Sequence, residues 1–169
     1  MDRGHRVPVV AVVGGRKSGK TTVVEAITRE LTESGYRVAV LKHIHHDEFD
    51  FDVPGKDTWR AFRAGSVAVV GASSSRAFLG IRGSPRLPVL LRLVEELSEP
   101  DIVLLEGFSS ELSQVPGVRV ISMGGRDPVP QGELLCECRG PEDAGRAVGA
   151  VRGILERAGS RPRGGRRSG

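Results

Sequence analysis

The sequence predicts an α/β protein with a mostly parallel sheet flanked by helices and with a β-hairpin extension. Short runs of β-branched residues alternate with segments of helical period along the chain, which is typical of a parallel sheet covered by helices. The run at 7–14 is continuously apolar, as buried central strands are. The runs at 66–72 and 76–81 are separated only by three serines, which favours a pair of strands joined by a short turn.

The first helix and the second strand follow directly from the run at 7–14. Apolar residues recur there at helical spacing, and Gly35 stands where a helix commonly ends. These apolar residues are Val23, Val24, Ile27 and Leu31. The run at 37–44 is then predicted to be the second strand. Residues 45–55 are acidic and irregular, which indicates a long functional loop.

A short helix is predicted after this loop. Asp57 or Thr58 would cap it, Trp59 and Phe62 would share one face, and Gly65 would end it. The two strands of the hairpin come next in the chain.

The rest of the chain continues the alternation. Pro88 is expected to begin a helix that Pro100 ends, with four apolar residues turned inward: Leu90, Leu91, Val94 and Leu97. Three strands are predicted, at 101–107, 118–124 and 133–139. The last helix is predicted over 141–158, with a stripe formed by Ala144, Val148, Val151 and Leu155.

Length and charge favour one domain over residues 1–159 and a basic disordered tail at 160–169. The chain has 169 residues, 38% of them apolar, enough for one core. Its net charge is +4, but the tail holds four arginines and no acid, so the body is close to neutral. We therefore do not expect nucleic acid as a partner. No stretch resembles a membrane span or a signal peptide, so we expect a cytoplasmic protein without a membrane partner.

The string from Gly14 to Thr21, GGRKSGKT, fits the phosphate-loop (Walker A) pattern. Glycines allow consecutive N–H groups to converge on phosphate oxygens, and the following helix presents its positive N-terminus. Lys20 would reach the β- and γ-phosphates, and the Thr21 hydroxyl would bind Mg²⁺. The sequence thus predicts a P-loop NTPase fold, with nucleotide contacts from Gly14, Gly15, Arg16, Lys17, Ser18, Gly19, Lys20, Thr21 and Thr22.

A phosphate-bound Mg²⁺ also needs a carboxylate near the end of a neighbouring buried strand. The run at 101–107 offers Asp101 at its start and Glu106 at its end. In a parallel sheet only the end lies beside the phosphate loop, so we choose Glu106, with Gly107 letting the backbone approach the γ-phosphate. The alternative is a strand-terminal acid that is simply solvated.

Three histidines and several acids follow the second predicted strand. His43 and His45 would lie on one face of a strand and could bind a transition metal with Asp47, contact phosphate, or orient Asp47 toward a water. His46 belongs to the same cluster. Backbone hydrogen bonding alone would also explain any single histidine. Ligands of open parallel sheets bind beyond the carboxyl ends of the strands, so we expect this loop, the phosphate loop and Glu106 to meet there.

Recognition of the base is the least determined feature. Asp127 follows the strand predicted at 118–124, and its carboxylate could accept the N1 and N2 protons of guanine. An Asp-Pro turn explains the same residue.

Cys136 and Cys138 are interpreted as reduced strand residues, because two thiolates are too few for a closed zinc site.

Together these strings resemble the molybdopterin-guanine dinucleotide biosynthesis protein B (MobB) family of small P-loop GTPases. The matching strings are GGRKSGKTTVVEAI, LKHIHHD, D-x-P-G-K-D-T with Arg60 and the turn Ala64-Gly65-Ser66, and LLEGF. The resemblance covers 8–108 and thins afterwards, where we find no guanine motif of the family.

The resemblance implies a homodimer that binds GTP with Mg²⁺ and hydrolyses it slowly. It also implies an accessory role toward the guanylyltransferase that attaches GMP to molybdopterin, so that a molybdopterin-type cofactor and that enzyme would be partners. Catalysis would fall to Lys20, Asp47 and Glu106, with Thr21, Glu106 and Asp47 as metal ligands. Lys56 and Asp57 would lie on the same rim.

Two other functions compete with this one. A metal-insertion chaperone GTPase would hold a transition metal on His43, His45 and His46, with Cys136 or Cys138 as a further ligand. Such proteins usually carry a longer His-rich tract, which is absent here. A small-molecule kinase would share the phosphate loop but should show an arginine-bearing lid, and no such segment is evident.

Overall fold

The computed structural model describes residues 7–44, 52–125, 132–160 and 162. The chain forms two compact units, one of residues 1–43 with 87–169 and one of residues 44–86. Each unit is described here by itself. The predicted division into a domain at 1–159 and a tail from 160 stays a prediction.

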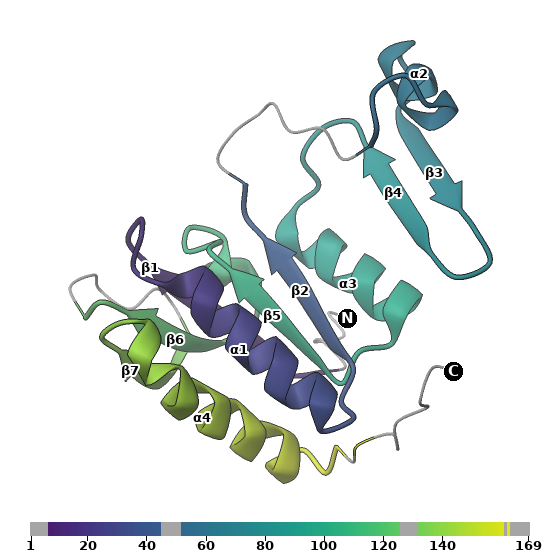
Figure 1. Ribbon diagram of the computed structural model, residues 1–169. Helices are drawn as coiled ribbons and strands as arrows, with labels where there is room; N and C mark the ends of the chain where they lie inside the picture. Colours follow the sequence, from purple (N-terminus) through teal and green to yellow (C-terminus); the bar gives the residue numbers. More distant parts are fainter. Residues whose placement is uncertain (1–6, 45–51, 126–131, 161, 163–169) are drawn as a thin grey trace. The chain divides into compact units, whose positions relative to one another are not determined.

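The larger unit contains a five-stranded sheet in the order β2-β5-β1-β6-β7 (Figure 1). All four strand pairs in it are parallel. The strands are β1 Val9–Gly14, β2 Val38–Lys42, β5 Ile102–Glu106, β6 Arg119–Met123 and β7 Glu133–Cys138. Because β1 lies at the centre and β5 beside it, the carboxyl ends of β1 and β5 are neighbours, which places the segments that follow them side by side.

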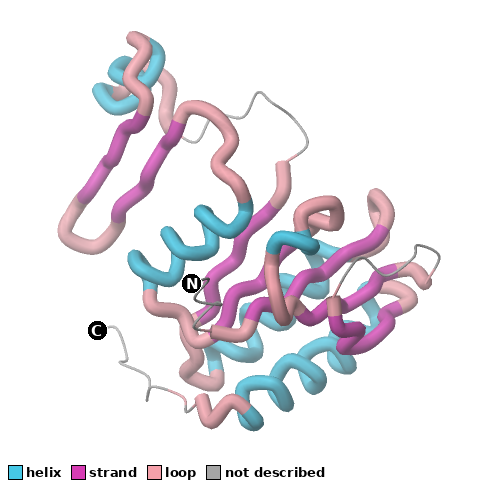
Figure 2. Tube along the Cα trace, turned by 180° about the vertical axis from the view of Figure 1, so that it is seen from behind, coloured by secondary structure: helices cyan, strands magenta, loops and turns pink. Residues whose placement is uncertain are grey.

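Helices cover both faces of this sheet (Figure 2). On one face α1 (Lys20–Glu33) and α4 (Ala144–Arg157) pack their buried stripes against alternate residues of β1, β5 and β6. On the other face α3 (Leu87–Ser98) and the short helix η1 (Leu112–Gln114) cover the intervening residues. A second short helix, η2 (Pro141–Asp143), leads into α4. A strand buried on both sides needs apolar side chains on both faces, which explains the continuous apolar runs of β1 and of residues 102–105 in β5.

The smaller unit consists of α2 (Asp57–Arg63) and a hairpin of β3 (Ala68–Ala72) and β4 (Ala77–Ile81). The two strands are antiparallel, in the register Ala68↔Ile81, Val70↔Leu79 and Ala72↔Ala77. Arg82 closes the unit: its guanidinium lies 4.7 Å from the centre of the Phe62 ring and donates to the Phe62 carbonyl oxygen. The predicted hairpin is therefore present.

Three local expectations were wrong. Lys56, not Asp57 or Thr58, is the N-cap of α2, and the Thr58 hydroxyl instead donates to Asp52 in the preceding loop. β2 ends at Lys42, so His43 and Ile44 lie beyond the strand. In α3, Leu97 is 71% exposed, because the last turn of the helix extends past the apolar cover that buries Leu87 and Leu91.

Within the described residues, none of the helices combines the length and the apolar character needed to cross a membrane.

Candidate nucleotide-binding site

The phosphate loop is a tight turn whose glycines at both ends are required by their surroundings. Gly14 has φ +149°, and a Cβ there would lie 2.5 Å from the Met123 carbonyl oxygen. Gly19, the N-cap of α1, has φ +92°, and a Cβ there would lie 2.9 Å from Cδ of Pro141. The neighbours β6 and η2 thus fix the path of the loop, and only glycine fits at these two positions.

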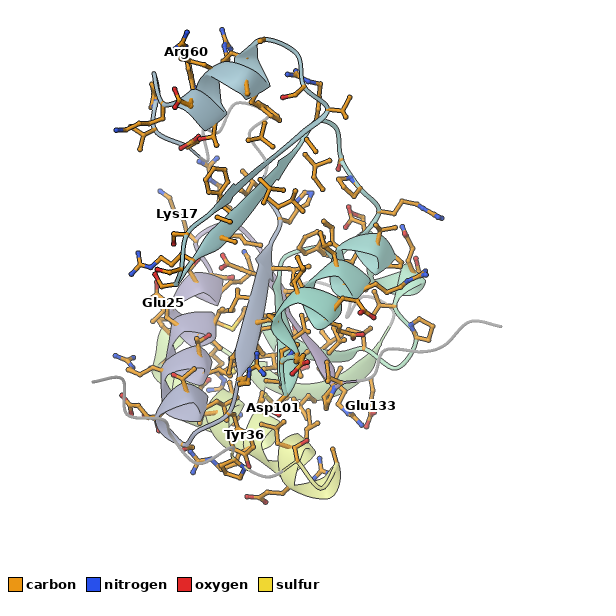
Figure 3. The ribbon with its side chains drawn as sticks, turned by 90° about the vertical axis from the view of Figure 1, so that its right-hand side faces the viewer. Lys17, Glu25, Tyr36, Arg60, Asp101 and Glu133 are labelled. Carbon is orange, nitrogen blue, oxygen red and sulfur yellow. The ribbon has the colours of Figure 1, made fainter. Side chains whose placement is uncertain are left out.

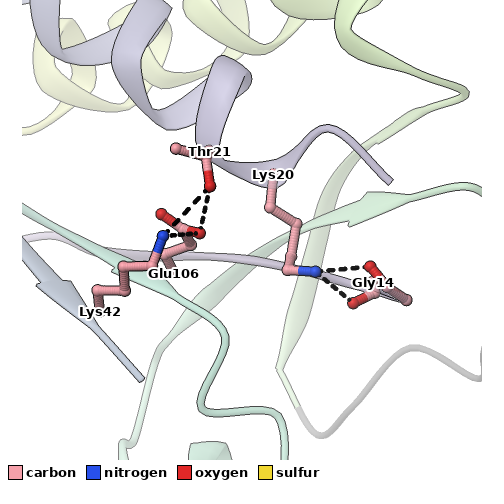
Figure 4. Close-up of polar contacts among 6 residues, drawn as sticks. Gly14, Lys20, Thr21, Lys42 and Glu106 are labelled. Atoms are coloured by element: carbon pink, nitrogen blue, oxygen red, sulfur yellow. Dashed lines mark hydrogen bonds and ion pairs between the residues drawn. The ribbon is translucent and has the colours of Figure 1, made fainter. Parts of the chain in front are cut away.

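The loop offers several donors to an anion. The Nζ of Lys20 donates to the carbonyl oxygens of Gly14 at 2.8 Å and Gly15 at 2.6 Å, so the ammonium lies directly over the loop (Figure 4). The Ser18 hydroxyl is buried and has no hydrogen-bond partner among the described residues. The first N–H groups of α1 have no acceptor within the helix, and its N-terminus carries partial positive charge. These donors fit a bound phosphate.

Arg16 and Lys17 add exposed positive charge to the same loop. Lys17 adopts φ +62°, which is rare for a residue with a side chain. Thr22 is exposed in the first turn of α1.

Glu106 ends β5 and lies directly beside the first turn of α1. The residue is 7% exposed, and its carboxylate accepts a hydrogen bond from the Thr21 hydroxyl at 2.6 Å (Figure 4). A hydroxyl and a carboxylate are both hard oxygen donors of the kind that Mg²⁺ prefers. The donor set therefore fits Mg²⁺, with Thr21 and Glu106 as the residues that would hold it.

Lys42 joins this pair from β2, and the sequence reasoning missed it. Its Nζ lies 2.8 Å from Oε1 of Glu106 and 3.3 Å from Oγ1 of Thr21. Lys42 and Glu106 are register partners at the ends of neighbouring parallel strands. The sequence alone did not mark Lys42, because the second strand was predicted to run on to residue 44, and only the observed register places Lys42 opposite Glu106.

Asp101 and Glu106 lie at opposite ends of the same strand region. The Asp101 carboxylate accepts the backbone N–H of Arg37 at 2.7 Å, where β2 begins. In Figure 3, Asp101 and Tyr36 lie at one end of the larger unit and Lys17 of the phosphate loop at the other. Glu106 therefore lies at the end of the sheet that carries the phosphate loop, and Asp101 lies at the other end, as expected for a parallel sheet.

Comparison with known proteins decides the family. Residues 9–131 match the family described as molybdopterin guanine dinucleotide synthesis protein B, MobB. The chain belongs to the MobB family. The match includes the phosphate loop, Lys42 and Glu106, so the resemblance expected from the sequence is confirmed.

Individual relatives agree with this assignment. The chain is 33% identical over 129 residues to the molybdopterin-guanine dinucleotide biosynthesis adapter protein of Haemophilus influenzae, a match that covers 75% of this chain and 70% of the relative. It is 32% identical over 108 residues to the protein of that name from Escherichia coli, covering 62% of this chain and 61% of that relative.

Solved structures of MobB proteins confirm the fold. A crystal structure of molybdopterin-guanine biosynthesis protein B superposes with a TM-score of 0.60 at 26% identity, over 88% of this chain and 99% of that one. The structure of Bacillus subtilis MobB gives a TM-score of 0.57 at 26% identity, over 85% and 97% of the two chains. The predicted mostly parallel sheet flanked by helices, consistent with the P-loop NTPase fold, is thus the fold of MobB proteins.

His43 is the histidine of this cluster that lies within the described residues. Its N–H donates to the Glu106 carbonyl oxygen at 2.9 Å, and its ring packs edge-on against Phe108, with centroids 5.2 Å apart. Nε2 lies 4.0 Å from Oε1 of Glu111. Gly107 donates its N–H to the Val12 carbonyl oxygen and lies against Cβ of His43. His43 and Gly107 therefore lie next to Glu106, where β2 and β5 end.

Four residues proposed for the site lie outside the described residues: His45, His46, Asp47 and Asp127. Lys56 and Asp57 belong to the smaller unit, where Asp57 is fully exposed and 4.0 Å from the Arg60 guanidinium. Their roles beside the nucleotide stay predictions.

The two cysteines are free thiols on β7. Burial raises the pKa of Cys136, and it raises the pKa of Cys138 to about 12. Such thiols stay protonated and are poor metal ligands. Among the residues that the structure describes, no group of three or more His, Cys, Asp or Glu side chains is arranged to hold a metal ion.

Proposed function

We propose that this MobB-family protein binds GTP with Mg²⁺, hydrolyses it slowly, and acts as an adapter in the formation of molybdopterin guanine dinucleotide. The main support for the nucleotide site is the 2.6 Å hydrogen bond between the Thr21 hydroxyl and the buried Glu106 carboxylate, next to a phosphate loop covered by Lys20. The names of the relatives from Haemophilus influenzae and Escherichia coli support the adapter role.

Separate residues of the chain would bind the phosphates, hold the metal and orient the attacking water. The loop amides, the Ser18 hydroxyl and the Lys20 ammonium would bind the β- and γ-phosphates and hold them still. Thr21 and Glu106, with Asp47 as a further ligand, would hold the metal, which when bound would neutralise charge on the phosphate oxygens. Asp47 would orient the attacking water.

The adapter role requires partners. We infer that the guanylyltransferase of the pathway and a molybdopterin-type cofactor are those partners, and that the protein works in the cytoplasm. A bound γ-phosphate would order the loops that follow β2 and β5, and those loops would present the surface that the enzyme recognises. Guanine would be selected by Asp127.

We also infer a homodimer. One face of the β3–β4 hairpin consists entirely of exposed apolar residues: Ala68, Val70, Ala72, Ala77, Leu79 and Ile81. Val70 is 63% exposed. An isolated two-stranded hairpin is marginally stable in water, and such a face is costly to leave in contact with it. A second copy of the chain, carrying the same face, would cover it.

The nucleotide proposal is tested by calorimetric titration of GTP and ATP, with phosphate release measured in parallel. We expect GTP to bind more tightly than ATP, and Lys20→Ala to weaken GTP binding on the order of tenfold to a hundredfold, because a hydrogen bond to a charged group is worth roughly 1.5–3 kcal/mol. Arg29→Ala, which removes an exposed cation from α1, is the matched control and should bind as the wild type does. Equal affinity of the wild type and Lys20→Ala would overturn the proposal.

A further inference from the structure

Three side chains from three different elements form a closed polar triangle at the end of the sheet. Thr21 comes from α1, Lys42 from β2 and Glu106 from β5 (Figure 4). The three contacts measure 2.6 Å from Thr21 to Glu106, 2.8 Å from Lys42 to Glu106 and 3.3 Å from Lys42 to Thr21. The Lys42 ammonium thus contacts the same two oxygens that fit Mg²⁺.

The charges and the exposure of this triangle are asymmetric. The Glu106 side chain is 9% exposed, and Lys42 provides its one ion pair within the described parts of the chain. The Lys42 side chain is 50% exposed. A buried carboxylate without a partner would be costly, so the ammonium stabilises it. Because the stem of Lys42 reaches solvent, the same ammonium can leave without unpacking the core.

Lys42 and a metal ion cannot use these oxygens together. Mg²⁺ binds oxygens at about 2.1 Å. An ammonium has three donors and no lone pair, so it cannot serve as a ligand. Two cations on one carboxylate oxygen would also repel each other. Binding of the metal must therefore displace the ammonium.

We propose that Lys42 is an exchangeable counter-ion of the magnesium site. Without Mg²⁺ it pairs with Glu106 and keeps Thr21 and Glu106 together; when Mg²⁺ binds, it is released. This inference rests on the proposed magnesium site. Lys42 opposes binding of the metal alone, so Mg²⁺ binds well only together with the triphosphate. Lys42 would thereby be a positioning residue that couples the metal to the nucleotide.

The test measures the melting temperature of nucleotide-free protein in chelator and in millimolar Mg²⁺, at matched ionic strength. We expect no Mg²⁺ response from the wild type. Lys42→Met should melt several degrees lower in chelator, roughly 2–4 °C for each kcal/mol lost, and Mg²⁺ should restore at least half of that loss. Lys42→Arg keeps the cation and should behave as the wild type.

A double variant separates exchange from simple structural pairing. Lys42→Met/Glu106→Gln removes both charges, so it should fold without the ion pair and should show no Mg²⁺ response. A Lys42→Met protein that melts lower but ignores Mg²⁺ overturns the proposal, as does a wild type that responds as strongly as Lys42→Met. These measurements use no nucleotide, so failure of GTP to bind would count against the proposed function alone.

Discussion

At the scale of single residues, Cys138 has the most strongly perturbed acid–base equilibrium of the described groups. Its thiol is buried at the end of β7, 3.8 Å from the Asp143 carbonyl oxygen, and burial raises its pKa from an ordinary 9.0 to about 12. The nearby Cys136 thiol adds to the effect, and the pKa of Cys136 is itself raised by burial. Neither thiol is therefore prepared for nucleophilic or redox chemistry.

We predict that Cys138 resists alkylation in the folded protein. At mildly alkaline pH, iodoacetamide should modify Cys138 more than about a hundredfold more slowly than a thiol in an unfolded peptide, because the thiolate fraction falls about tenfold for each unit of pKa. Cys136 should react at an intermediate rate. Mass spectrometry of labelled protein in native buffer and in urea measures both sites. Equal labelling of Cys138 in the two conditions would contradict its burial.

The raised pKa of the same thiol also fixes a pH dependence of stability. Above pH 9.0 the unfolded thiol ionises, whereas the folded thiol keeps its proton until about pH 12. The folded state then binds more protons than the unfolded state, so this thiol makes the free energy of unfolding fall as the pH rises through that window. Cys138→Ala should remove this part of the decline in urea titrations.

Residue patterns predicted Glu106 but not Lys42, and the reason is physical. A metal site requires a carboxylate near the phosphate loop, so strand order alone selects Glu106. A lysine at the end of a strand has no such requirement, since it is usually a solvated cation. Only the register that pairs Lys42 with Glu106 shows that this lysine neutralises a buried acid.

At the scale of elements, the phosphate loop depends on its neighbours more than on its own sequence. β6 packs against one end of the loop through Met123, and η2 packs against the other through Pro141. The Gly14 and Gly19 positions are therefore fixed by segments more than a hundred residues away. A loop held in this way can present its amides without reorganising when an anion binds.

We predict that alanine at the two adjacent glycines of the loop changes the free energy of unfolding by very different amounts. Gly14→Ala places a Cβ against the Met123 carbonyl oxygen in an unfavourable backbone conformation, and it should lower the free energy of unfolding by about 2–4 kcal/mol. Gly15 has no atom within 4 Å of an added Cβ, so Gly15→Ala should change it by less than about 1 kcal/mol. Urea unfolding measures both variants. Equal losses would show that the loop is not held by β6.

The sequence predicted elements well where buried apolar residues define them. It predicted them poorly at exposed ends, where few apolar residues mark the boundary. The spacing of apolar residues predicted α1 and β5 correctly, because the buried positions of these two elements form a regular pattern in the sequence. Leu97 was misplaced because helical period cannot tell where the apolar cover ends. Thr58 was misplaced as a cap because its hydroxyl donates to Asp52 outside the helix. Such choices depend on tertiary contacts.

At the scale of the whole molecule, the smaller unit cannot bury its own apolar surface. α2 packs against β3, and the strands turn Val69 and Gly80 inward, which leaves the opposite face of the hairpin exposed. The residues on that face are alanine, valine, leucine and isoleucine, and none of them carries a charge. A face of this kind suits an isologous contact, in which each copy offers the same patch to the other. The homodimer proposal depends on this surface.

We predict that a charge on this face separates the dimer. Val70→Asp should give a monomer by light scattering coupled to gel filtration at concentrations where the wild type is dimeric, because burying an unpaired carboxylate costs several kcal/mol. Val53→Asp is the matched control, since Val53 is also exposed, at 60%, in the same unit but lies outside the hairpin. It should remain dimeric. A dimeric Val70→Asp protein would show that the dimer contact lies elsewhere. If the monomeric variant binds GTP as tightly as the wild type, each copy holds a complete nucleotide site.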